Sequence, residues 1–132
     1  MAKYFFTKEK DLPKRVFVKA AINHLGIINE SVRYMEVFGF GQRADFKERA
    51  DRQIRFHAII IRNESQDILE SYRNSTIVHE KMRKIINRIT KNSDIMMESY
   101  DDASPYLMSK EDLFKSLKED IDELTSLILL YY

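Results

Sequence analysis

The sequence is poor in the residues that end or cross-link secondary structure: it has no cysteine, and only three glycines and two prolines among 132 residues. Without cysteine there is no disulfide framework, no thiolate nucleophile and no zinc–cysteine site, which fits a reducing compartment. All-β folds need turn residues every ~8–12 positions. The scarcity of glycine and proline therefore argues for long helices.

Long apolar segments are also missing. No apolar run approaches the roughly 20 residues that a membrane helix needs. The N-terminal residues MAKYFFTKEKD return to charged side chains after two phenylalanines, which is unlike a signal peptide. We therefore expect a soluble cytoplasmic protein with no membrane association.

A charge of one sign does not dominate, because 22 Lys and Arg residues face 21 Asp and Glu residues. A strongly basic protein bound non-specifically along nucleic acid is not indicated, and nothing indicates specificity for DNA. A local basic patch remains compatible with this balance.

Apolar residues recur at helical spacing along most of the chain. The Asp11-Leu12-Pro13 segment resembles a helix start, so we expect an N-terminal arm over residues 1–10 and a helix from there to about Phe38. Gly39-Phe40-Gly41 is expected to end this helix. Its predicted buried face steps by three and four residues and comprises Phe17, Ala21, Leu25, Ile28, Val32 and Met35.

A second helix is predicted from about Asp45 to about Arg73, and Asn74-Ser75-Thr76 then interrupts the pattern. The buried stripe predicted for this helix is Ile54, Ala58, Ile61, Ile68 and Tyr72, and the next helix is predicted to bury Val78, Met82, Ile85, Ile86 and Ile89. Residues 92–108 are expected to form an irregular connection. The last helix begins at Ser109, a helix-start signature. The prediction is one domain over residues 1–132, an all-α antiparallel bundle of four main helices.

The last helix has an unusually wide apolar stripe. Its seam consists of Phe114, Leu117, Ile121, Leu124, Ile128 and Tyr131, and Leu113, Leu127 and Leu130 widen it. A stripe of this width suggests burial against more than one neighbour or a contact with another protein.

Of the three histidines, His24 and His57 lie among apolar neighbours and are expected to be partly buried with a satisfied hydrogen bond. No HExxH or Glu-x-x-His spacing is present, so a metal site would have to assemble from separate helices. The sequence gives no reason to predict a metal or a cofactor.

Arg73 and His79 are the candidate catalytic residues. On a continuous helix, at about 100° per residue, they would lie about 120° apart and would not share a face. The interruption at residues 74–76 changes this geometry and allows both side chains to meet at a corner. A histidine near a helix N-terminus is favoured in its neutral form, and arginine can grip two phosphate oxygens.

The segment RNSTIVHE, from Arg73 to Glu80, resembles the RNxxxxH signature of HEPN domains. These all-α bundles, often homodimeric, occur in many toxin, anti-phage and CRISPR-associated ribonucleases. The resemblance covers about eight residues and differs from the family in two ways: the gap of five is not the commonest, and Lys81 stands where one large toxin branch has tyrosine.

The resemblance implies a metal-independent endoribonuclease in a defence or toxin–antitoxin setting. Arg73 would stabilise the phosphorane charge and His79 would act as acid or base while the ribose 2′-hydroxyl attacks the adjacent phosphate. Asn74 would orient the substrate or the arginine. Tyr72 could stack a base, and Arg83 and Lys84 could bind the RNA backbone. A homodimer is expected, with an antitoxin or other protein as a further partner.

Two alternatives remain open at this stage. Arg73 can be an ordinary surface residue, with residues 74–76 as a helix cap and His79 uninvolved. The chain can also be a non-catalytic helical adaptor or regulatory protein, related to phage or defence, that acts through protein–protein contacts at the apolar stripe of its last helix.

Overall fold

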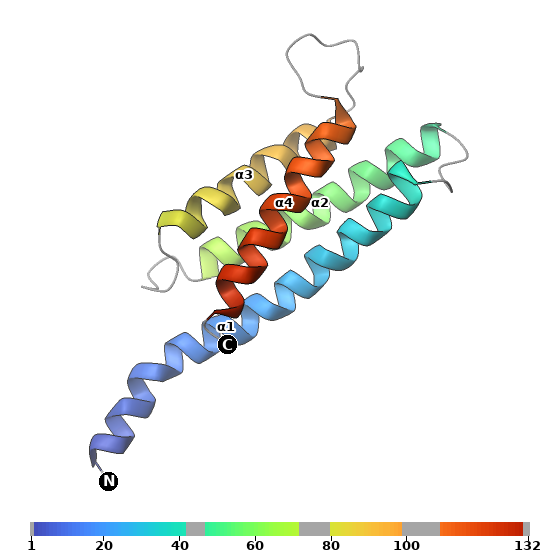
Figure 1. Cartoon of the computed structure of the whole chain (residues 1–132). Helices are drawn as coiled ribbons and strands as arrows, with labels where there is room; N and C mark the ends of the chain where they lie inside the picture. Colours follow the sequence, from blue (N-terminus) through green and yellow to red (C-terminus); the bar gives the residue numbers. More distant parts are fainter. Residues whose placement is uncertain (1, 42–46, 72–79, 99–108, 131–132) are drawn as a thin grey trace.

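The computed structural model describes residues 2–41, 47–71, 80–98 and 109–130 (Figure 1). Four α-helices account for most of them: α1 (Ala2–Met35), α2 (Lys47–Ser71), α3 (Glu80–Met97) and α4 (Lys110–Leu129). A π-helical turn, η1 (Glu36–Phe40), extends α1. No strand occurs within these ranges, so the predicted all-α class is confirmed.

The helices form an antiparallel bundle in which each packs against two neighbours. α1 packs on α2, α2 on α3, α3 on α4, and α4 returns to α1. Chain direction alternates from one helix to the next, and the N-terminal part of α1 extends beyond the other three helices (Figure 1). This is the up-down-up-down arrangement of a four-helix bundle.

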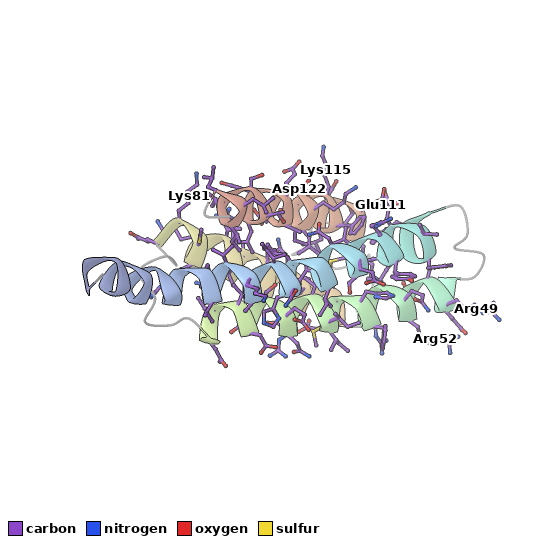
Figure 2. The ribbon with its side chains drawn as sticks, turned by 90° about the horizontal axis from the view of Figure 1, so that it is seen from below. Arg49, Arg52, Lys81, Glu111, Lys115 and Asp122 are labelled. Carbon is purple, nitrogen blue, oxygen red and sulfur yellow. The ribbon has the colours of Figure 1, made fainter. Side chains whose placement is uncertain are left out.

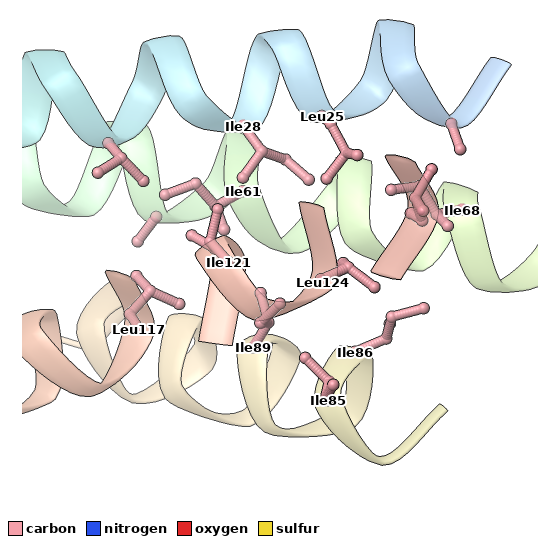
Figure 3. Packing of buried hydrophobic residues seen from close by; sticks show 14 of the residues in the cluster. Leu25, Ile28, Ile61, Ile68, Ile85, Ile86, Ile89, Leu117, Ile121 and Leu124 are labelled. Atoms are coloured by element: carbon pink, nitrogen blue, oxygen red, sulfur yellow. The ribbon is translucent and has the colours of Figure 1, made fainter. Parts of the chain in front are cut away.

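The core consists of the apolar stripes predicted for all four helices. Every described member of the predicted stripes of α1, α2 and α3 is buried, as are the five described members of the α4 seam, Phe114, Leu117, Ile121, Leu124 and Ile128. Side chains from all four helices point into the same central space (Figure 3). The predicted stripe members Tyr72, Val78 and Tyr131 lie outside the described residues.

The first helix differs from its prediction at its start. It begins at Ala2, so the helix start predicted at Asp11–Pro13 is wrong and the N-terminal arm 1–10 is helical from Ala2 onwards. Its end is as predicted, within Gly39-Phe40-Gly41, because the chain continues in helical form to Phe40 and becomes extended at Gly41. The α1–η1 unit is therefore longer than apolar periodicity alone indicates.

Gly39 explains why this end of the first helix can pack so closely. A Cβ atom at Gly39 would lie 2.6 Å from Cγ1 of Ile54, nearer than real Cβ contacts come. The absence of a side chain lets η1 approach α2 directly. The glycine that the sequence suggested as a stop signal is thus a packing position.

The connection predicted over residues 92–108 begins later than expected. α3 continues to Met97 and buries Ser93 and Met96 on its inner face, so residues 92–97 are helical. The prediction is wrong for these residues because core contacts outweigh the modest helix propensities of Asn92, Ser93 and Asp94. Glu98 is no longer helical, as predicted, and residues 99–108 lie outside the described residues.

The start of α4 is as predicted. Ser109 is the N-cap, and its hydroxyl oxygen accepts a hydrogen bond of 3.2 Å from the backbone N–H of Asp112. Most of the wide stripe that follows is covered within the bundle: Leu113 is buried and Leu127 is half-buried, whereas Leu130 is 79% exposed. The breadth of this stripe therefore reflects packing inside the chain more than an open surface.

Charged side chains cover the outside of the bundle. Figure 2 shows Arg52, Glu111 and Asp122 projecting from three different places on it. Within the described ranges, no helix combines the length and apolar character needed to cross a lipid bilayer.

Candidate functional site

The proposed catalytic segment connects α2 to α3. α2 is described to Ser71 and α3 from Glu80, and the two helices run antiparallel, so the chain reverses direction between them. The interruption predicted at residues 74–76 lies outside the described residues. Tyr72, Arg73, Asn74 and His79 all fall in the connecting segment 72–79, outside the described residues. Their side-chain geometry, and with it the convergence of Arg73 and His79, stays a prediction.

Two predicted substrate-binding residues lie on the described first turns of α3. Arg83 and Lys84 are both exposed, as residues that bind the phosphates of the RNA backbone must be. The Lys84 ammonium lies 3.6 Å from a carboxylate oxygen of Glu80, one turn earlier, and both side chains are largely solvated. A pair of this kind contributes only a few tenths of a kcal/mol, about 0.3–0.5. It would not prevent Lys84 from contacting a phosphate.

Other basic residues of α3 face α4. Arg88 donates from Nη2 to Oδ1 of Asp120 at 3.0 Å and from Nε at 3.3 Å. The hydrogen bond to Asp120 raises the pKa of the Arg88 guanidinium. The Lys81 ammonium lies 3.6 Å from a carboxylate oxygen of Glu123, which is on α4 together with Asp120. Lys81 and Arg88 of α3 thus form ion pairs with α4, and Arg83 and Lys84 of the same helix are exposed.

His24 behaves as predicted for a structural histidine. It is half-buried in the α1–α2 interface, and its Nδ1 lies within hydrogen-bonding distance of the Glu64 carboxylate. The pair joins helices whose residues are 40 positions apart in the sequence. The partner could not be identified from local spacing.

His57 is buried as predicted, but its predicted hydrogen bond is not present among the described residues. Tyr34 stacks on the imidazole with ring centroids 5.4 Å apart, and Phe56 contacts it edge-on at 5.1 Å. Nδ1 is buried without a hydrogen-bond partner in the described part of the chain. Burial lowers the pKa of His57, so the neutral imidazole is favoured.

The aromatic residues around His57 form a surface that sequence reasoning missed. We call Tyr34, Phe38, His57 and Phe56 the aromatic face: Tyr34 also stacks on Phe38 at 6.0 Å, and Phe56 is 59% exposed. The signal in the sequence was a second apolar stripe along α1 and η1, at Ile27, Tyr34 and Phe38, outside the core stripe. Exposed aromatic groups of this kind are typical of binding surfaces.

Comparisons with protein-family models, with characterised proteins and with solved structures found no match for this chain.

Proposed function

We propose that this protein is a metal-independent endoribonuclease of the HEPN type, with Arg73 and His79 as its catalytic pair. The observation that supports the proposal is that α2, described to Ser71, and α3, described from Glu80, run antiparallel, so the chain that carries the RNxxxxH-like segment is not part of one unbroken helix. An unbroken helix would have held the two side chains on different faces. A connection between two helices removes that obstacle.

The chemistry proposed needs three contributions from the chain. Arg73 stabilises the negative charge that develops on the phosphorane, and His79 transfers a proton as the 2′-hydroxyl attacks. Asn74 orients the substrate or Arg73, and Tyr72 stacks on a base. The exposed Arg83 and Lys84, on the turns of α3 that follow His79, support this reading because they can bind adjacent phosphates.

Two copies of the chain are proposed to act together in a defence or toxin–antitoxin setting, with an antitoxin or other protein as a further partner. This part of the proposal rests on the family resemblance. The exposed members of the aromatic face, Tyr34, Phe38 and Phe56, support it, because a dimer or a partner protein would remove apolar surface from water there.

The test is RNA cleavage in the presence of EDTA by four purified proteins: the unaltered chain, Arg73→Ala, His79→Ala, and the matched control Arg52→Ala. Arg52 is an exposed arginine of α2 in the half of that helix remote from Ser71. We expect products ending in 2′,3′-cyclic phosphate, a loss of at least about 100-fold in rate for Arg73→Ala and His79→Ala, and little change for Arg52→Ala.

Three results would contradict the nuclease proposal: equal rates in all four proteins, cleavage that EDTA abolishes, or no cleavage of any RNA in a varied panel. A DNA strand of the same sequence should remain intact, because it lacks the attacking 2′-hydroxyl.

The second candidate is the non-catalytic adaptor. The covered stripe of α4 gives it less support than the sequence suggested, whereas the aromatic face gives it an exposed surface elsewhere. Absence of cleavage in a correctly folded chain would favour this candidate.

A further inference from the structure

A cluster of metal-ligating side chains lies in the interface between α1 and α2. It consists of His24 on α1 and of Glu64 and Asp67 on α2, and one ligand atom from each residue lies within 4.8 Å of the other two. We propose that these residues bind a single divalent transition-metal ion, with Zn²⁺ as the best fit. This site is separate from the proposed catalytic residues and does not depend on the proposed ribonuclease function.

The positions of the three residues follow from the helix packing. Glu64 and Asp67 are three positions apart on α2, so their carboxylates lie on one side of that helix. His24 faces them because antiparallel packing of α1 and α2 brings its imidazole against Glu64. Helical geometry thus supplies two ligands and tertiary packing supplies the third.

Core side chains near the cluster hold α1 and α2 against each other. Leu25 and Ile28 of α1 and Ile61 and Ile68 of α2 are buried beside the cluster, and Figure 3 shows them in the packed interior. His24 and Glu64 are therefore held by rigid backbone, with side chains 25% and 20% exposed. Partial exposure leaves a path by which an ion can enter from solvent.

Only a small adjustment is needed for coordination. Ligand atoms around one Zn²⁺, at about 2.0–2.2 Å from the metal, are about 3–3.5 Å apart. Asp67 is exposed and has no hydrogen bond or ion pair to the described residues, so its carboxylate can rotate toward the other two groups. Three protein ligands leave at least one coordination position for water.

The ligand set indicates which ion should bind. Imidazole nitrogen favours Zn²⁺, Co²⁺ or Ni²⁺ over Mg²⁺, and the two carboxylates balance the charge of a divalent cation. The bound ion would join α1 to α2 and stabilise the folded chain, because it binds the assembled site and not the separated helices.

To test this, the full-length protein is treated with EDTA, freed of the chelator, and then titrated with Zn²⁺, Co²⁺ or Mg²⁺ in the absence of RNA. We expect one equivalent of Zn²⁺ to bind and raise Tm, Co²⁺ to give a visible absorption band, and Mg²⁺ to have little effect. Asp67→Asn should weaken Zn²⁺ binding by at least about tenfold. Asp122→Asn, an exposed carboxylate of α4, is the matched control and should leave binding unchanged.

Asp67→Asn is the most informative variant, because Asp67 is exposed and has no partner among the described residues. Its loss should leave the fold intact, which circular dichroism can check. His24→Ala and Glu64→Gln should also lose binding. The proposal is overturned if the unaltered chain binds no Zn²⁺, if Asp67→Asn binds as tightly as Asp122→Asn, or if His79→Ala abolishes binding. Because RNA cleavage is measured in EDTA and metal binding without RNA, failure of one proposal leaves the other intact.

Discussion

At the scale of single residues, His57 combines burial with an ionisable ring. It lies between Tyr34 and Phe56, its Nδ1 has no partner among the described residues, and burial lowers its pKa. The unfolded chain, in which histidine titrates near about 6.5, therefore binds a proton that the folded protein excludes. Between the lowered folded pKa and about 6.5, stability must fall as pH falls.

This predicts the effect of replacing His57 with phenylalanine, which keeps an aromatic ring and removes the titration. The free energy of unfolding of His57→Phe should vary less between about pH 7 and pH 5 than that of the unaltered protein. Urea denaturation at a series of pH values measures the difference. Identical pH dependence in the two proteins would show that His57 is not held neutral by burial.

At the scale of elements, a capping hydrogen bond between a side chain and the backbone determines where a helix begins. Ser109 caps α4 through the backbone N–H of Asp112, and the sequence identified this end correctly. The sequence placed the start of α1 too late and the end of α3 too early, because both helices extend through residues with weaker local signals. Caps are encoded locally, whereas the extension of a helix also depends on what it packs against.

Removal of the α4 cap should therefore have a measurable cost. Ser109→Ala is expected to lower the free energy of unfolding by about 1 kcal/mol, because the N–H of Asp112 loses its acceptor. Ser126→Ala is the matched control: Ser126 is exposed inside the same helix, where alanine is the better helix former. Chemical denaturation of both variants provides the comparison. Equal losses in the two would contradict the capping role.

At the scale of the whole molecule, one core joins all four helices. Ile61 of α2 is fully buried at its centre, beside Ile28 of α1 and Ile121 of α4 (Figure 3). Ile59, two positions away on α2, is 41% exposed. The same residue type thus occupies opposite environments on one helix.

This contrast predicts very different costs for the same substitution. Ile61→Ala should lower the free energy of unfolding by about 2–5 kcal/mol, because it removes buried contacts and leaves a cavity. Ile59→Ala should cost no more than about 1 kcal/mol. Thermal and urea unfolding of the two variants measure both values, and similar losses would be inconsistent with a core centred on Ile61.

The candidate site shows how far local sequence signals reach. The separation of α2 from α3 was predictable, because Asn74, Ser75 and Thr76 compete with the helical backbone for hydrogen bonds. The ion pair of Arg88 with Asp120 was not predictable. Its partner Asp120 lies 32 positions away on a different helix.

The sequence by itself determined the four helices, the buried face of each and the cap of α4, because helical periodicity and capping depend on residues within a few positions of one another. Only the tertiary structure decided that the wide stripe of α4 is largely covered, that aromatic side chains gather around His57, and that His24 meets Glu64 and Asp67. Each of these depends on how one helix is rotated against another, and the spacing of residues along a single helix does not contain that rotation.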